Sequence, residues 1–143
     1  MNTGDAWQLR HFFYLFIGAA FLMIWVQAGL FHWRGAFRNV AMWIPVLFSP
    51  VLSAAGLALA FGGGRAIDTL FVIVFGLGVL DGLIGTYMHF AGVKHYIGGF
   101  TLRNFMAGPP VILPMIFTAL AAAALLVFFF WPAQAGGSYA YIH

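Results

Sequence analysis

Residues 69–90, TLFVIVFGLGVLDGLIGTYMHF, form the third long hydrophobic stretch of this chain and the most informative one. A transmembrane helix needs about 20 mainly apolar residues to cross roughly 30 Å of hydrocarbon. The stretch meets that requirement with one carboxylate, Asp81, near its middle. An ionisable group inside a span is costly unless it faces protein, water or a partner. We therefore predict a transmembrane helix whose Asp81 does not face lipid.

Small residues mark one face of this predicted helix. Gly78, Gly82, Gly85 and His89 follow one another at spacings of four, three and four residues, which places them along one stripe. Small residues let another helix, or a flat ligand, approach the backbone closely. Two interpretations follow. Either the stripe is a helix–helix contact and His89 bonds water or a carbonyl group, or Gly82 and Gly85 make room for a porphyrin or quinone ring that His89 binds.

The composition excludes a soluble domain. Hydrophobic residues make up 64% of the 143 residues and charged residues 6%, and the mean hydropathy is +0.98. A soluble surface needs far more charge than this. The absence of cysteine excludes disulfides, iron–sulfur clusters and c-type haem held by this chain. The few basic residues flank the hydrophobic stretches, where they orient a membrane protein, and do not indicate nucleic-acid binding.

The same reasoning predicts the fold class for the whole chain. We expect an all-α integral membrane protein with a single domain, residues 1–143: a four-helix transmembrane bundle with one interfacial loop segment. The segment at 91–107 is rich in glycine, aromatic and basic residues, which is typical of a segment lying along a membrane surface. The predicted spans are about 11–33, 40–61, 69–90 and 108–131. The first is too long for a cleavable signal and is expected to be retained.

Two histidines are predicted to meet at one side of the membrane. His32 ends the first span and His89 ends the third, and His95 follows in the next loop. Axial ligation of haem b by two histidines needs imidazoles from facing helices beside a small residue. His32 and His89 are therefore candidate metal ligands if haem is present. The other candidate cofactor-binding residues are His95, Gly82, Gly85, Arg34 and Arg38.

Arg34 and Arg38 have more than one interpretation. They lie four residues apart in the loop after the first span. They could bind lipid phosphate, a partner's carboxylates or the propionates of a haem. The arrangement of histidines and glycines resembles, in kind, the haem-bearing membrane anchors of respiratory dehydrogenases, although no sequence signature names a family.

Asp81 and Gln27 are predicted to be buried polar residues at similar depth in the bundle. Asp81 could be a neutral acid bonded to Gln27, Ser49 or Ser53. It could instead be a step on a proton path to a quinone, or pair with a partner chain. A polar side chain inside a span commonly joins helices by hydrogen bonding.

The distribution of positive charge predicts the orientation. The loops 33–39 and 91–108 carry four Lys and Arg residues against two on the other side. The positive-inside rule places these loops in the cytoplasm and both termini outside, in what we expect to be a bacterial inner membrane.

Three functions remain open from the sequence. No glutamate and no motif of hydrolytic or nucleotide chemistry is present, so autonomous catalysis is not expected. The first hypothesis is a small accessory or anchor subunit of a larger membrane complex, respiratory or otherwise redox, whose partners are other membrane subunits and lipid, without nucleic acid. The alternative is an electron-transfer subunit binding haem b or quinone between spans one and three. The second alternative is a small membrane transporter with a polar cavity around Asp81.

Overall fold

The computed structural model describes residues 3–131 of the chain, in which every regular element is helical. Four long helices, α1 (Thr3–Arg34), α2 (Trp43–Phe61), α3 (Arg65–Gly92) and α5 (Ile112–Phe130), form the body of the molecule. The shorter elements are a 3₁₀ turn, η1 (Val40–Met42), a π-helical turn, η2 (Val93–Ile97), and α4 (Leu102–Ala107). The all-α four-helix prediction is confirmed.

Within the described residues, four helices are long and apolar enough to cross a membrane. They are Gln8–Arg34, Val40–Phe61, Arg65–Ile97 and Ile112–Phe130. These four helices identify the chain as a membrane protein, as its composition predicts.

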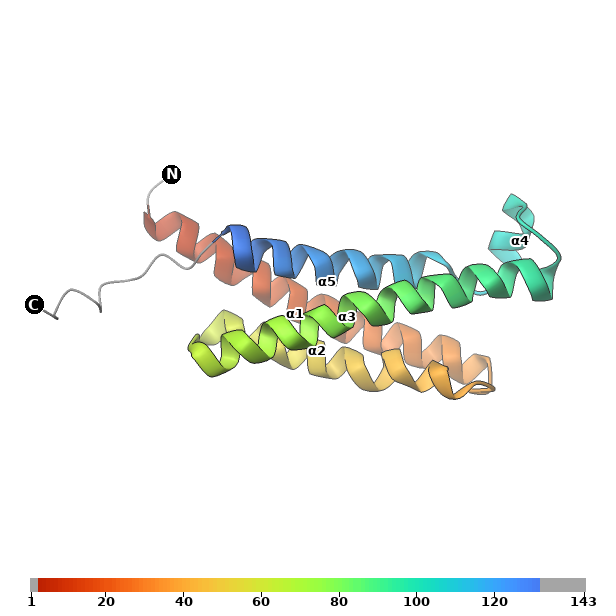
Figure 1. Ribbon diagram of the computed structural model, residues 1–143, viewed down its shortest axis with the longest axis horizontal. Coiled ribbons are helices and arrows are strands. Elements are labelled where there is room, and N and C mark those ends of the chain that lie inside the picture. The colour runs from red at the N-terminus through yellow and green to blue at the C-terminus, as the bar shows by residue number, and fades with distance from the viewer. Residues whose placement is uncertain (1–2, 132–143) are drawn as a thin grey trace, which may run out of the picture.

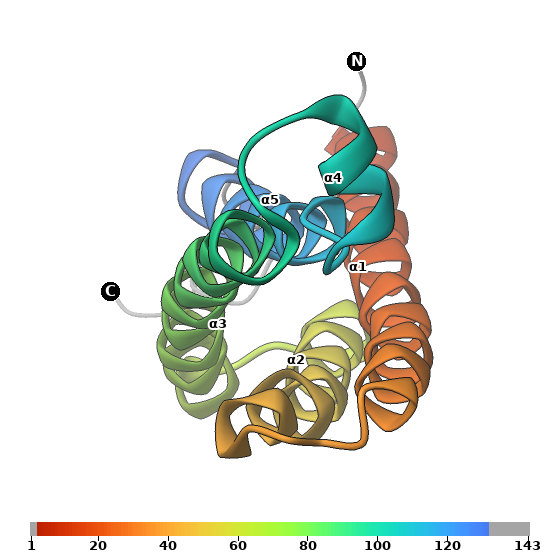
Figure 2. The ribbon, with the colours of Figure 1, turned by 90° about the vertical axis from the view of Figure 1, so that its right-hand side faces the viewer.

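The helices pack as two antiparallel pairs that lie across each other (Figure 1). α1 packs most extensively on α2, and α3 on α5, while α2 and α3 join the pairs. Seen along the bundle, the four helices surround a common centre (Figure 2). The ends of α1 and α3 and the starts of α2 and α5 lie at the same end of the bundle, which we call the histidine end (Figure 1). The opposite end, where α1 and α3 start and α5 ends, is called the tyrosine end.

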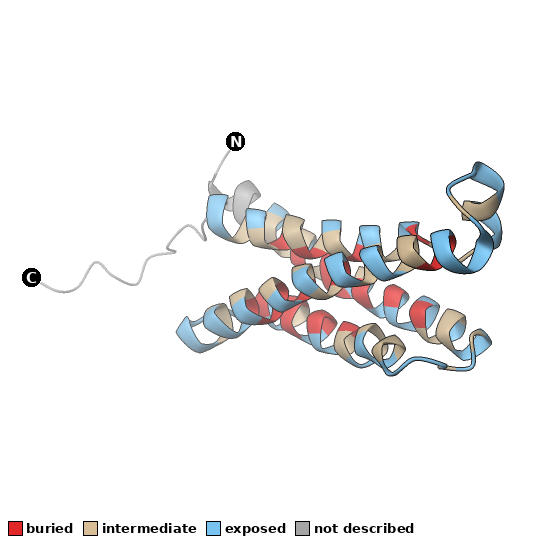
Figure 3. Cartoon of the chain, turned by 45° about the vertical axis from the view of Figure 1, so that its right-hand side comes forward, coloured by how far each residue is buried: buried red, intermediate tan, exposed pale blue. Residues whose placement is uncertain are grey.

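Aromatic rings fill the centre between the two pairs. The ring of Phe21 in α1 meets Phe75 of α3 and Phe117 of α5 edge to face, at centroid distances of 5.7 and 5.1 Å. All three side chains are buried. Buried residues follow the inner faces of the helices, and the outer faces are exposed (Figure 3). Because the outward side chains are also largely apolar, this surface suits lipid or another membrane subunit.

A close approach of α1 and α2 complements this core. The buried Ser53 hydroxyl of α2 donates a hydrogen bond of 2.8 Å to the Gly18 carbonyl of α1. A Cβ added at Gly56 would lie 3.4 Å from the Gly18 backbone nitrogen. The small residues on both helices therefore allow their backbones to come together, as small residues do in membrane bundles.

The segment after the third predicted span is more helical than expected. The predicted interfacial loop 91–107 begins as a continuation of α3 to Gly92, followed by the π-helical turn η2. Gly92 lies against Pro109, because a Cβ there would be 3.0 Å from that ring. The fourth long helix begins at Ile112, later than the predicted 108, so Pro109 and Pro110 precede the helix. Thr101 caps the short helix α4 through a hydrogen bond from the Asn104 amide.

Candidate functional site

The histidine end brings together two of the predicted site residues. His32, in the last turn of α1, and His89, in the last turn of α3, have ring centroids 6.4 Å apart and planes inclined at 76°. His89 Nδ1 lies 3.0 Å from the carbonyl oxygen of Pro110, just before α5. A carbonyl oxygen only accepts, so Nδ1 carries the proton and donates. In a neutral ring this leaves Nε2 with a free lone pair.

The separation of the two rings suits a shared metal. Because a metal–imidazole bond is about 2.0 Å, two rings on one metal have nitrogens about 4 Å apart and centroids roughly 6 Å apart. The observed 6.4 Å between His32 and His89 is close to that value. A backbone carbonyl on the far nitrogen is also the usual way in which a metal-binding histidine is oriented. The ring separation would therefore allow His32 and His89 to hold one metal between them.

Of the two interpretations of the glycine stripe, the packing favours the helix–helix contact over a cofactor ring at Gly82 and Gly85. A Cβ at Gly82 would lie 2.9 Å from the Thr118 backbone nitrogen of α5, and one at Gly85 would lie 3.3 Å from Pro114. Gly82 and Gly85 therefore face α5 and make the helix–helix contact. By contrast, a Cβ at Gly29 of α1, three residues before His32, would have no atom within 4 Å. The backbone at Gly29 is therefore not covered by a neighbouring helix.

The remaining charged candidates lie outside the histidine pair. Arg34, Arg38 and His95 are all exposed. No interaction described for residues 8–131 joins them to His32 or His89. Nor do three or more metal-binding side chains cluster within the described residues. The arginines remain available to lipid phosphate or a partner, while the geometry of the pair rests on His32 and His89 alone.

Asp81 lies halfway along α3 and is half-buried. Its Oδ2 atom is fully buried and has no hydrogen-bond partner in the described part of the chain. The prediction that Gln27 is buried is wrong, because its side chain is exposed on α1. Ser49 and Ser53 donate to backbone carbonyls. None of the three partners expected for Asp81 therefore satisfies that oxygen.

The tyrosine end contains polar residues that the sequence analysis did not select. Tyr14 of α1 is buried, and its ring meets Phe71 of α3 edge to face at 5.4 Å. The guanidinium carbon of Arg10 lies 5.3 Å from the Tyr14 ring centroid and 6.0 Å from that of Phe128 in α5. Arg10 and Tyr14 are four residues apart and so lie on one helix face. This spacing is the sequence feature that could have identified the pair.

Comparisons with protein-family models, with curated proteins and with solved structures find no match to this chain.

Proposed function

We propose that this chain is a small integral-membrane accessory or anchor subunit of a larger membrane complex, respiratory or otherwise redox. The observation that carries the proposal is Asp81. Its side chain lies in the middle of a membrane-spanning helix, and its buried Oδ2 has no hydrogen-bond partner in the described residues.

The energetics of that oxygen favour a partner chain. A buried polar group without a hydrogen bond costs about 1–3 kcal/mol, and more when it is charged. Water cannot supply the missing bond in the hydrocarbon region, so ionisable residues there normally pair with another protein group or a water-filled cavity. The exposed Gln27 on α1 is a second polar group within a span that the described chain leaves uncovered. Oδ2 itself is covered by this chain, but Asp81 is only half-buried, so a polar side chain from a partner's helix can meet the exposed part of the carboxyl group.

Substitutions at Asp81 test this proposal. The complex is purified in mild detergent from cells that express wild type, Asp81→Asn or Asp81→Leu, with Leu80→Ala as the control at the exposed neighbouring position. Because losing a hydrogen bond to a charged group costs about 1.5–3 kcal/mol, we expect Asp81→Leu to reduce stoichiometric partner recovery about tenfold or more. Asp81→Asn, which still forms hydrogen bonds, should retain more of the partner.

Two outcomes would contradict the proposal. One is a wild-type protein whose native mass, measured after release from lipid nanodiscs, equals that of a single chain without a partner. The other is full partner recovery with Asp81→Leu. The unfolding temperature of the isolated Asp81→Leu chain should equal or exceed that of wild type, which separates a binding defect from a folding defect.

The histidine pair favours a second candidate function, an electron-transfer subunit that binds haem b or quinone. His32 and His89 would hold the iron, or His32 would bond a quinone oxygen while His89 is held by Pro110. Haem, when bound, supplies one-electron transfer. The filled faces of Gly82 and Gly85 limit this candidate to a group beside Gly29.

An absorption spectrum tests the second candidate directly. The purified protein is measured oxidised and reduced, and extracted quinones are quantified by mass spectrometry. A b-type spectrum that His32→Ala and His89→Ala abolish, and that His11→Ala at the opposite end retains, would support haem. A colourless preparation without quinone would remove this candidate and leave the first proposal standing.

Membrane placement completes the proposal. We place the chain in a bacterial inner membrane, with loops 33–39 and 91–108 in the cytoplasm and both termini outside. Support comes from the exposed basic side chains at the histidine end, which are Arg34, Arg38, Lys94 and Arg103. A transporter has no comparable support, because the buried hydroxyls of Ser49 and Ser53 already donate to backbone carbonyls.

A further inference from the structure

Two polar atoms at the tyrosine end are buried without a hydrogen-bond partner in the described residues: Arg10 Nε and the Tyr14 hydroxyl. Tyr14 is only 1% exposed, so bulk water does not reach its side chain. Almost all such groups in native proteins bond either protein or an ordered water. An unsatisfied hydroxyl would cost about 1–3 kcal/mol. Arg10 and Tyr14 also interact with each other through their side chains. The pair therefore has room for a ligand that accepts from Arg10 Nε and either donates to or accepts from the Tyr14 hydroxyl.

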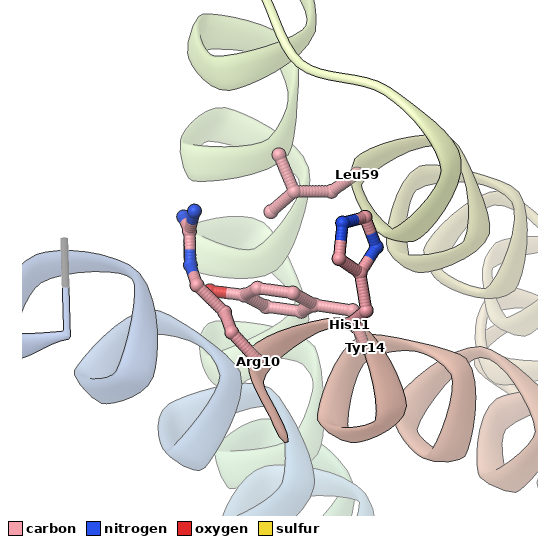
Figure 4. A pocket seen from close by; sticks show the side chains of 4 residues that line it. All are labelled: Arg10, His11, Tyr14 and Leu59. Atoms are coloured by element: carbon pink, nitrogen blue, oxygen red, sulfur yellow. The ribbon is translucent and has the colours of Figure 1, made fainter. Parts of the chain in front are cut away.

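The space beside these residues has the size of such a ligand. A cavity of ≈ 20 Å³ is lined by Arg10, His11, Tyr14 and Leu59 (Figure 4). An ordered water needs about 10–15 Å³ of such volume and two to four polar partners. A lipid headgroup or a quinone ring is far larger than this space. We propose that the cavity is a binding site for one water molecule, which joins Arg10 Nε to the Tyr14 hydroxyl.

The donors and acceptors match a bridging water. A guanidinium N–H only donates, so the water oxygen accepts from Arg10. A phenol both donates and accepts, so Tyr14 completes the bridge in either direction. Both partners are on α1, one turn apart, so the water is held by one rigid element.

The small size of the cavity favours water over a larger anion, and nearby groups partly balance the charge of Arg10. The Arg10 guanidinium lies over the rings of Tyr14 and Phe128, which attract a cation. Asp68 at the start of α3 also acts electrostatically on Tyr14, so a negative charge is already present nearby. That carboxylate offsets part of the attraction of Arg10 for an anion, and a cavity of ≈ 20 Å³ has room for one water.

The bridge has a consequence for the bundle. Tyr14 touches Phe71 of α3, and Phe71 stacks on Phe128 of α5 at 5.3 Å. A water that fixes Arg10 and Tyr14 thus fixes the contact of α1 with both other helices. This role is independent of the complex subunit and electron-transfer proposals, because it involves neither Asp81 nor the histidine pair.

A high-resolution structure of the full chain crystallised from a lipid phase tests the proposal. We expect one density peak within hydrogen-bonding distance of Arg10 Nε and the Tyr14 hydroxyl. The peak should be lost in Tyr14→Phe and retained in Tyr87→Phe, the control at a side chain that is 73% exposed. A direct Arg10–Tyr14 hydrogen bond with no peak would overturn the proposal. So would an anomalous bromide peak at this position in bromide-soaked crystals.

Solid-state NMR in lipid gives a second readout that does not need crystals. With ¹⁵N-labelled arginine, magnetisation from water should reach Arg10 Nε at short mixing times in wild type and in Tyr87→Phe. The transfer should fall at least several-fold in Tyr14→Phe. Equal transfer in Tyr14→Phe and wild type, or none in wild type, would reject a water held between the two groups.

Discussion

Each end of the bundle has a pair of rings that meet edge to face, but the two pairs differ in their burial and in their polar neighbours. At the tyrosine end, Tyr14 and Phe71 meet edge to face, and the Tyr14 ring also lines a cavity of one water's size. At the histidine end, His32 and His89 also meet edge to face, yet both rings are half-buried. There a backbone carbonyl, and not a cavity, satisfies one ring nitrogen. The first arrangement joins helices through buried rings, while the second leaves two imidazoles partly exposed.

The largest expected effect comes from removing the ring that closes the tyrosine end. Tyr14→Ala should destabilise the folded chain by about 3 kcal/mol, as truncating a buried aromatic ring does. The exposed-residue control Tyr87→Ala should change stability by less than about 0.5 kcal/mol. Unfolding in detergent, followed by tryptophan fluorescence, measures both. Equal midpoints for the two variants would show that the tyrosine end is not the better-packed end.

A smaller effect is expected where α3 and α5 touch between the two ends. Gly82→Ala places a Cβ 2.9 Å from the Thr118 backbone nitrogen, and helix backbone cannot yield as a flexible side chain can. Overpacking of this kind costs about 1–3 kcal/mol. The matched control is Gly76→Ala, where a Cβ meets nothing within 4 Å. It should stabilise α3 by about 0.5–1 kcal/mol, since alanine favours a helix interior over glycine.

The measurement is the thermal unfolding midpoint of each glycine variant in the same detergent. Opposite signs for Gly82→Ala and Gly76→Ala would locate the α3–α5 contact on the Gly82 face. A stabilising Gly82→Ala would contradict that contact and would reopen this face to a cofactor ring.

A third prediction separates the two histidines. His89→Ala removes the hydrogen bond to Pro110 and should cost about 1 kcal/mol. His32 meets Phe37 and His89 through ring contacts, so His32→Ala should cost less. Unfolding of cofactor-free protein measures both variants. A larger loss of stability in His32→Ala than in His89→Ala would contradict the view that His89 is held more firmly, through its hydrogen bond to Pro110.

Much of this comparison follows from the sequence, because bilayer thickness fixes the length of a span. Four apolar stretches predict four helices, and alternating directions bring the ends of spans one and three to one side. His32 and His89 could therefore be paired in advance. The sequence does not predict which neighbour each helix face contacts, because this depends on which helix packs opposite. Gly82 meets Thr118, 36 positions later, and no local pattern names that partner.

The polar residues show the same limit. The sequence predicts that Gln27 and Asp81 lie at a similar depth in the membrane and could form a hydrogen bond. Depth along a helix axis, however, does not determine which face of the helix a side chain is on. Gln27 is exposed, while its neighbour Ala28 is buried, a difference of one helical step. The burial of Tyr14 depends on Phe71, far along the chain. Where α3 extends past residue 90, Gly92 lies against Pro109, a contact that no local pattern predicts.

The smallest expected effect concerns the turn that follows His32, where the backbone departs from the usual sequence rule. A glycine after a helix normally takes the left-handed conformation. Here the positive φ angles belong to Ala36 (57°) and Phe37 (45°), and not to Gly35. A residue with a Cβ in that region costs about 1–2 kcal/mol. Glycine avoids this cost but loses more conformational entropy on folding, which cancels part of the gain. Ala36→Gly should therefore stabilise the chain by about 0.5 kcal/mol in the unfolding measurement. The matched control Gly35→Ala should not destabilise it, because Gly35 does not hold the left-handed conformation. If both substitutions destabilise the chain, the positive φ angle belongs to Gly35 and the turn geometry described here is rejected.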